Sequence, residues 1–316
     1  MTTVRAAAVD CGTNSIRLLI ADIDAERRVL TDIRRDMKIV RLGEGVDRTG
    51  RLSEAAIDRT IGALRGYADQ ITEHGATLVR MVATSASRDA ENAADFTRQV
   101  KEVLGVVPEV VSGEEEAALS FTGATRELGA GEDGPYLVTD IGGGSTEFAS
   151  DAAGPGLAHI SVNIGCVRLT ERHLHSDPPT AGEIAATKRD IDATLEQVAT
   201  VLSQSADVPV TTAKTLVGLA GSVTTIAGIA LGLDEYDCAR IHHSRVSAGR
   251  VHEIAERLLG QTRAERGAIG VMHPGRVDVI GGGALILDAI MTRFGFAAVL
   301  VSEHDILDGI AWSLVP

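Results

Sequence analysis

Two short stretches of the sequence, Asp10-Cys-Gly-Thr-Asn-Ser15 and Asp140-Ile-Gly-Gly-Gly-Ser145, share one pattern. In each stretch a glycine lies at position +2 from the aspartate and a serine at position +5. Each stretch ends one apolar run and leads into another, which predicts a strand, a tight turn and a second strand. The repeat therefore predicts two related α/β halves, with coincidence as the alternative interpretation.

The rest of the chain alternates between apolar, strand-like runs and segments with helical periodicity, as in an α/β protein. We expect strands at 4–10, 16–23, 28–33, 38–42, 77–84, 106–111, 136–140, 147–150, 216–219 and 298–301. We expect helices at 53–74, 91–104, 112 onward, 166–174, 180–203, 222–232, 247–259, 277–293 and 303–314. A loop of Gly, Glu and Asp at 129–134 divides the chain. It predicts an N-terminal domain over 1–125, on which the segment 303–316 packs back, and a C-terminal domain over 126–302.

Composition excludes several classes of protein. Of 316 residues, 44% are apolar, enough for a substantial core, so the chain as a whole is not disordered. Aromatic residues are only 3% and the net charge is −14, so we expect no nucleic-acid partner. We also expect no membrane span and no secretory signal. Three widely separated cysteines form neither a disulfide framework nor a zinc pattern, which predicts a cytoplasmic protein.

Three glycine-containing turns are candidates for phosphate binding. A turn that lacks side chains lets its backbone N–H groups converge on an anion, and neighbouring hydroxyls add donors. The loops offer Gly143, Gly144 and Ser145, then Asn14 and Ser15, and finally Gly221 and Ser222. The alternative for each loop is that a tight turn needs glycine for steric reasons alone, but three such loops together favour phosphate.

Two acidic residues flank the loop of Gly143, Gly144 and Ser145. Asp140 ends one expected strand and Glu147 begins the next, so a hairpin brings both carboxylates to the mouth of the loop, where they could hold Mg²⁺. The alternative is that Asp140 caps the turn and Glu147 is an exposed strand residue. The sequence contains no P-loop, no His-Glu-x-x-His and no G-x-S-x-G, which excludes three common classes of enzyme.

Six segments in this order resemble the exopolyphosphatase/guanosine pentaphosphate phosphohydrolase (Ppx/GppA) family, in its short two-domain, actinobacterial-type form. They are Asp10-Cys-Gly-Thr-Asn-Ser-Ile-Arg17, Val82-Ala-Thr-Ser-Ala-Ser-Arg88, Ser112-Gly-Glu-Glu-Glu-Ala117, Asp140-Ile-Gly-Gly-Gly-Ser-Thr-Glu147, Leu219-Ala-Gly-Ser-Val-Thr-Thr225 and Val301-Ser-Glu-His-Asp-Ile-Leu-Asp-Gly309. The resemblance spans essentially the whole chain. It implies an α/β fold of two actin-like domains (the actin/sugar-kinase/Hsp70 superfold, ribonuclease H-like) that flank a cleft.

The resemblance also implies roles for individual residues. Glu116 falls at the position of the catalytic base, and Asp140 and Glu147 at those of the metal-associated acids, with Mg²⁺ as the expected cofactor and Mn²⁺ as the alternative. The implied phosphate-binding residues are Asn14, Ser15, Arg88, Gly143, Gly144, Ser145, Gly221 and Ser222. Ala118 stands where many members have Arg, which removes one positive charge. The family further implies a homodimer.

The activity implied by this family is hydrolysis of a terminal phosphoanhydride bond. The first hypothesis is an exopolyphosphatase that releases orthophosphate from the ends of inorganic polyphosphate. The second is the conversion of pppGpp to ppGpp, which uses the same kind of bond. A third hypothesis, from another class, is a nucleotide-binding kinase or sensor of the actin fold. An inactive homologue is a fourth.

Overall fold

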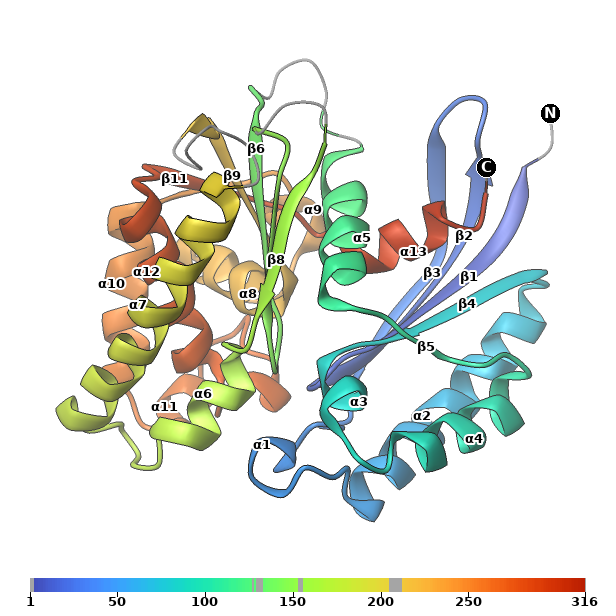
Figure 1. Ribbon diagram of the computed structural model, residues 1–316, viewed down its shortest axis with the longest axis horizontal. Helices are drawn as coiled ribbons and strands as arrows, with labels where there is room; N and C mark the ends of the chain where they lie inside the picture. Colours follow the sequence, from blue (N-terminus) through green and yellow to red (C-terminus); the bar gives the residue numbers. More distant parts are fainter. Residues whose placement is uncertain (1–2, 127, 129–132, 153–155, 205–211, 316) are drawn as a thin grey trace. The chain divides into compact units, whose positions relative to one another are not determined.

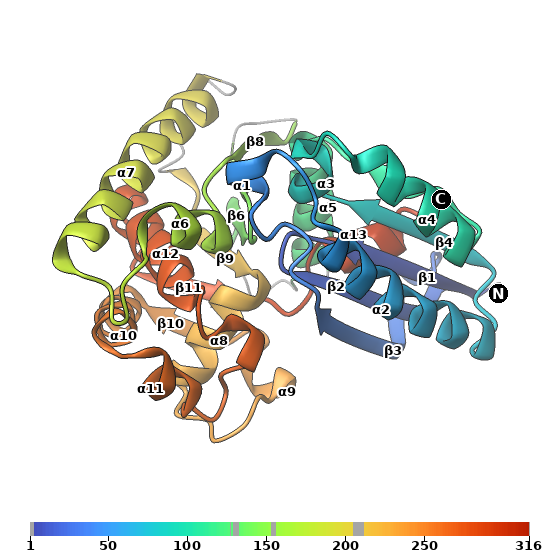
Figure 2. The same cartoon turned by 90° about the horizontal axis from the view of Figure 1, so that it is seen from below.

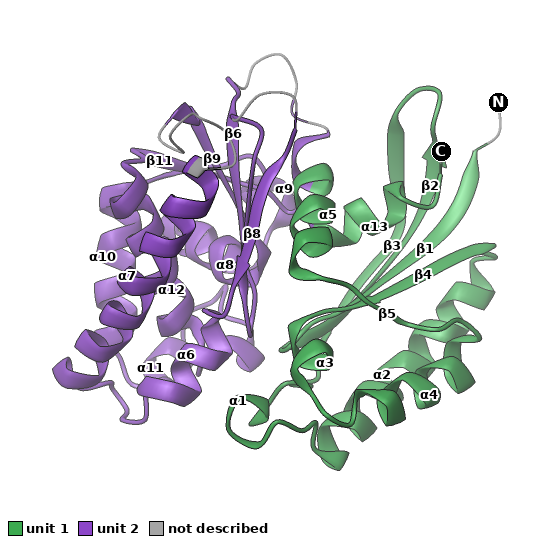
Figure 3. Cartoon of the chain, in the orientation of Figure 1, with its two compact units in different colours: residues 1–123, 306–316 green, residues 124–305 purple. Residues whose placement is uncertain are grey.

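The chain divides into two compact units in a computed structural model, which describes residues 3–126, 128, 133–152, 156–204 and 212–315 (Figure 3). Unit 1 comprises residues 1–123 and 306–316, and unit 2 comprises residues 124–305. The sequence placed the two boundaries after residues 125 and 302. Most of the loop expected at 129–134 lies outside the described residues.

Unit 1 contains, in its described residues, a sheet with strand order β3-β2-β1-β4-β5 (Figure 1). Strands β1 to β3 are antiparallel neighbours, whereas β4 and β5 run parallel to β1. The strands are β1 (Val4–Cys11), β2 (Ser15–Asp24), β3 (Val29–Ile39), β4 (Leu78–Ala83) and β5 (Glu109–Val110). The helices are α1 (Val46–Thr49), α2 (Glu54–Glu73), α3 (Ser85–Asp89), α4 (Ala93–Leu104), α5 (Gly113–Thr125) and α13 (Ile306–Trp312).

Alternation along β1 gives this sheet two buried faces, because successive side chains of a strand point to opposite sides. Ala7 and Val9 belong to a core shared with α2 and α4, which lie together on one face of the sheet (Figures 1 and 2). Ala6 and Ala8 belong to a second core, shared with α5 and α13. The return of the chain to unit 1 as α13 therefore covers a face that would otherwise expose apolar side chains to water.

Unit 2 repeats the same arrangement in its described residues. Its strand order is β10-β11-β9-β6-β7-β8, so that β6 to β9 and β11 occupy the places of β1 to β5, and β10 extends one edge. The strands are β6 (Tyr136–Ile141), β7 (Thr146–Ser150), β8 (Ala158–Val162), β9 (Thr215–Leu219), β10 (Arg245–Ser247) and β11 (Ala298–Val301). The α-helices are α6 (Cys166–His173), α7 (Ala181–Gln204), α8 (Ala220–Ala230), α9 (Cys238–Ile241), α10 (Ala248–Gly260), α11 (Arg263–Gly267) and α12 (Ile280–Phe294), and a 3₁₀ turn covers Pro274–Arg276. The repeated strand order confirms the predicted α/β fold class with two related units.

The prediction from the sequence was wrong for some elements, mainly where exposed residues weakened the hydrophobic pattern. The two strands expected at 28–33 and 38–42 are one continuous strand, β3, which pairs with β2 along its whole length. Its polar middle suggested a break, but β3 is an edge strand, and edge strands carry charged residues that discourage aggregation. The strand expected at 106–111 is reduced to β5, and the last helix, expected from 303, begins at 306. The prediction missed β8, β10 and several one-turn helices. Within the described ranges no helix is long and apolar enough to cross a membrane.

Candidate phosphate-binding site

The two sequence-related turns have the same backbone geometry. In unit 1 the N–H of Gly12 donates to the carbonyl of Ser15, and in unit 2 the N–H of Gly142 donates to the carbonyl of Ser145, both at 3.0 Å. The strands on either side are also paired in the same register. The shared spacing of Asp, Gly and Ser is therefore a real structural repeat rather than a coincidence.

Helix α6 holds the carbonyl oxygens of the glycine turn in unit 2. The bonds run from Cys166 N to Gly142 O (2.9 Å), from Val167 N to Gly143 O (2.9 Å), from Arg168 N to Gly143 O (3.1 Å) and from Arg168 Nε to Gly144 O (2.6 Å). The first backbone N–H groups of a helix have no partner within the helix, so these donors are available for the turn. Gly165, just before α6, has no room for a side chain, because a Cβ there would collide with the carbonyl of Gly143.

The orientation of these carbonyls fixes the direction of the next N–H groups. In a planar trans peptide the C=O of one residue and the N–H of the following residue point in opposite directions. The amides of Gly143, Gly144 and Ser145 therefore point away from α6, and they donate to no acceptor among the described residues. Successive amides directed to one side form an anion-binding nest, which is the arrangement predicted for these three residues.

The corresponding turn in unit 1 is built by the same rule with different partners. The carbonyl of Thr13 accepts from the N–H of Gly43 (2.9 Å), and that of Asn14 accepts from Val40 and Arg41 (3.0 and 2.8 Å). The amides of Asn14 and Ser15 are consequently directed away from the segment 40–43. Both turns thus present donors at the residues that the sequence singled out.

A pair of carboxylates sits beside the turn of unit 2, where unit 1 has an ion pair. Asp140 and Glu147 lie directly opposite each other on β6 and β7 and are 7% and 2% exposed. At the equivalent register position of unit 1, Arg17 lies opposite Asp10 and donates to its Oδ2 from Nε (2.9 Å) and from an NH2 group (2.7 Å).

The replacement of an arginine by a second acid makes this position suited to a cation. Like charges directly opposite on a sheet repel, more so when they are buried, and a bound cation removes the repulsion. Ser161 orients Glu147, because its Oγ donates a hydrogen bond to Oε1 of that residue (2.7 Å). No cluster of three or more His, Cys, Asp or Glu suited to a metal occurs in the part of the chain that the structure describes. Two carboxylates fit Mg²⁺, which commonly keeps several water or phosphate ligands.

The three consecutive glutamates at the start of α5 have different environments. Glu114 and Glu115 are exposed, and Glu115 pairs with Arg80 at 2.7 Å. Glu116 is only 7% exposed and accepts a hydrogen bond at Oε2 from Arg88 (3.2 Å), which also donates to the carbonyl of Val111 (3.1 Å). The structure therefore brings together, within unit 1, the predicted base and the predicted phosphate-binding arginine.

The third predicted loop opens helix α8, where an arginine lies over the backbone. A Cβ at Gly221 would collide with the guanidinium of Arg276, which donates to the carbonyl of Gly221 and to Oγ1 of Thr225, each at 3.2 Å. Ala220, directly before, has φ of +65°, a strained conformation for a residue with a Cβ. Such outliers cluster at binding sites, where the surrounding structure holds them.

The buried hydroxyl of Ser222 faces the interior of unit 2. A Cβ at Gly283 of α12 would collide with it, and it hydrogen-bonds the thiol of Cys166. Burial raises the pKa of this thiol, and the hydrogen bond from Ser222 offsets part of that rise. Cys166 therefore connects the loop at Ser222 with the turn at Gly142. A direct contact of the Ser222 hydroxyl with phosphate stays a prediction.

Sequence reasoning missed three residues of this region: Gly165, which admits the turn, Ser161, which orients Glu147, and Arg276, which covers Gly221. Arg276 lies in a short turn outside every quoted motif, and Gly165 is one of 34 glycines. The available signal for Gly165 was its position directly before the helix expected at 166–174.

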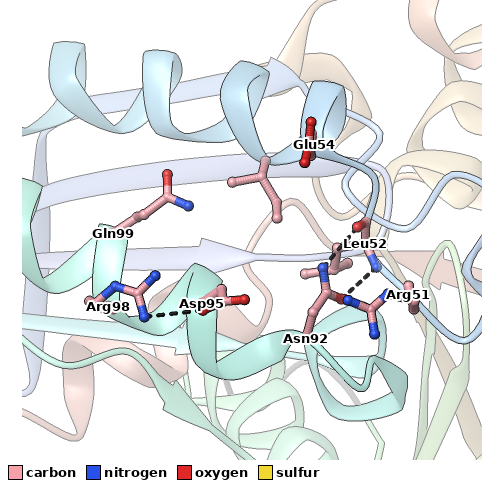
Figure 4. Close-up of a pocket in the computed structure, with 8 residues that line it drawn as sticks. Arg51, Leu52, Glu54, Asn92, Asp95, Arg98 and Gln99 are labelled. Carbon is pink, nitrogen blue, oxygen red and sulfur yellow. Dashed lines mark hydrogen bonds and ion pairs between the residues drawn. The ribbon is translucent and has the colours of Figure 1, made fainter.

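A cavity of about 350 Å³ lies elsewhere in unit 1, between the start of α2 and helix α4 (Figure 4). Ile57 and Leu52 form its apolar part. Its polar side chains are largely engaged with one another or with the backbone: Arg98 pairs with Asp95, Arg51 with Glu91, and Asn92 makes two bonds to the backbone of Leu52. None of the predicted site residues lines this cavity, so it is separate from the turns predicted to bind phosphate.

The chain belongs to the Ppx/GppA phosphatase family, whose sequence profile matches residues 19–316. It is 49% identical over 325 aligned positions to exopolyphosphatase 2 of Mycobacterium tuberculosis, covering 99% of both chains. Among solved structures it resembles an exopolyphosphatase-like protein (39% identity, TM-score 0.90, 98% of both chains). It also resembles the Aquifex aeolicus Ppx/GppA family member (31% identity, TM-score 0.81, 99% of this chain and 97% of that one).

We predict that Gly165→Ala displaces the turn and weakens the binding of inorganic phosphate by about tenfold or more. The physical reason is that at least one hydrogen bond to a charged oxygen is lost. Titration calorimetry with inorganic phosphate measures the effect. Gly249→Ala, in helix α10 with open space around it, is the matched control and should leave the affinity unchanged. Equal affinity in both variants would show that the contact of Gly165 with Gly143 does not position the binding groups.

Proposed function

We propose that the protein is an exopolyphosphatase, a phosphoanhydride hydrolase that removes the terminal phosphate of inorganic polyphosphate as orthophosphate. The observation that carries the proposal is the set of three consecutive N–H groups, at Gly143, Gly144 and Ser145, that α6 directs to one side beside two buried carboxylates. The full-length similarity to an exopolyphosphatase supports the choice of substrate.

The reaction needs an activated water molecule on one side of the terminal phosphorus. We infer that Glu116 orients this water and accepts its proton as the oxygen attacks. The bond from phosphorus to the bridging oxygen breaks, and its electron pair leaves with the shortened chain. Arg88 holds the Glu116 carboxylate by a hydrogen bond, which restricts its orientation.

Charge on the phosphoryl oxygens must be neutralised as the bridging bond lengthens. Preorganised donors are effective here because they need no reorganisation during the reaction. The amides of Gly143, Gly144 and Ser145 fill this role in our proposal, with those of Asn14 and Ser15 as a second set. Arg88 and Arg276 would add positive charge for a polyanionic substrate.

Asp140 and Glu147 are the residues that would hold Mg²⁺. When bound, the ion would supply positive charge to the phosphate oxygens and to the leaving group. The two acids lie on paired strands, so their separation is fixed by the sheet, and Ser161 restrains Glu147. The backbone positions of Asp140 and Glu147 are thus set by the sheet.

A side-by-side assay of phosphate release tests the function. Inorganic polyphosphates of several lengths and pppGpp are compared, each with Mg²⁺ and with a chelator. We expect turnover of polyphosphate, with pppGpp, which ends in the same kind of bond, as the second candidate substrate. Absence of turnover on every polyphosphate would refute the proposed function. A homodimer remains part of the proposal, and sedimentation measures it directly.

The glutamate that acts as base can be identified by substitution. We predict that Glu116→Gln folds normally but lowers kcat by about 10²–10⁴-fold, the usual contribution of a positioned base. Glu115→Gln, the neighbouring exposed glutamate, is the control and should keep most of the activity. Steady-state kinetics on polyphosphate measures both, and near-normal turnover by Glu116→Gln would remove this residue from the role.

The metal-binding role predicts a change in Mg²⁺ dependence. Glu147→Gln should raise the Mg²⁺ concentration for half-maximal rate by roughly tenfold or more, and Ser161→Ala should act in the same direction, because partners of ligands typically contribute 10–100-fold to affinity. Glu256→Gln, an exposed glutamate of α10, should leave it unchanged. The measurement is phosphate release against free Mg²⁺, and an unchanged midpoint in Glu147→Gln would contradict the assignment.

A further inference from the structure

Arg168 binds the glycine turn with both its backbone and its side chain. Its N–H donates to the carbonyl of Gly143 (3.1 Å), while Nε of its half-buried guanidinium donates to the carbonyl of Gly144 (2.6 Å). The carbonyls of Gly142 and Gly143 are held by backbone donors of α6, which any residue could supply. The carbonyl of Gly144, in contrast, is held by a side chain.

We propose that Arg168 is a positioning residue whose Nε fixes the peptide between Gly144 and Ser145, so that the Ser145 N–H faces the phosphoryl group. The proposal rests on the proposed function, since it assigns a role in the same reaction. The proposed role depends on the hydrogen bond from Nε, and not on the net positive charge of the side chain.

The physical need for such a residue comes from the glycines themselves. Without a Cβ, Gly143 and Gly144 accept conformations that other residues avoid, so the peptide that follows Gly144 can turn over at small cost. A turned-over peptide would present a carbonyl oxygen to the phosphoryl group, where the mechanism requires a donor. A hydrogen bond to a charged donor biases such an equilibrium by roughly ten- to a hundredfold.

The alternative role for Arg168 is to attract the polyanion by its charge alone. Substitution by Gln and by Lys separates positioning from charge attraction, because these two side chains differ at the position that Nε occupies in Arg. In Gln the amide nitrogen lies the same number of bonds from Cα as Nε lies in Arg, and it carries N–H but no charge. In Lys that position is a methylene, and the charge lies one atom further out.

The experiment compares Arg168→Gln, Arg168→Lys and Arg168→Met with the wild-type protein by steady-state phosphate release from polyphosphate, at low and high salt. We expect kcat to fall by about ten- to a hundredfold in the Met and Lys variants, and the Gln variant to recover about two- to tenfold of this loss, because its uncharged donor makes a weaker bond. Arg172→Met, one turn further along α6 and paired with Asp190, is the control and should lose less than about twofold. A thermal melt of each variant detects any loss of folded protein.

The outcomes distinguish the roles. Rescue by Gln and not by Lys supports positioning. Rescue by Lys and not by Gln, with a higher KM and a weaker salt dependence in the Met variant, would overturn it in favour of simple charge. A lower Tm with unchanged kcat would likewise overturn it, because it indicates a merely structural bond. An inactive wild-type protein would instead refute the proposed function, independently of the pattern among variants.

Discussion

The site depends on one constraint, which is that a peptide group cannot direct its carbonyl and the following N–H to the same side. Helix α6 supplies donors to the carbonyls of three successive glycines, and this alone directs three amides to the opposite side. Gly165 makes the approach of α6 possible, because any side chain there would collide with the turn. This candidate anion-binding geometry is thus produced by packing inside unit 2, from the backbone of α6 and the side chain of Arg168.

The two units share a strand order and a hairpin geometry, but they differ in the charge of the side chains at one register position. At one register position of the repeated hairpin, unit 1 pairs Asp10 with Arg17, whereas unit 2 places Asp140 opposite Glu147. Unit 1 therefore has an arginine beside its acid, whereas unit 2 has a second acid at the same position, an arrangement suited to a cation. The two units therefore share a fold but have different chemical roles. In our proposal unit 2 holds the metal and unit 1 supplies the base.

The sequence predicted the parts of this structure that depend on local pattern. The spacing of Asp, Gly and Ser indicated both hairpins, and periodicity located the long helices. It could not separate Glu116 from Glu114 and Glu115, because their difference is one of burial, and the residue was identified only by family resemblance. It also missed Arg276, since no local pattern shows that the turn at Pro274 lies over Gly221. The edge strand β3 was read as two strands because exposed strands lack a hydrophobic signal.

The most direct test of the central claim observes the glycine amides themselves. In protein labelled with ¹⁵N-glycine, inorganic phosphate is titrated in the presence of Mg²⁺ and the backbone resonances are followed by NMR. The account predicts saturable shifts of the Gly143 and Gly144 amides, with those of Gly249 and Gly260, in helix α10, unmoved. Unshifted Gly143 and Gly144 resonances at phosphate concentrations that inhibit hydrolysis would contradict it.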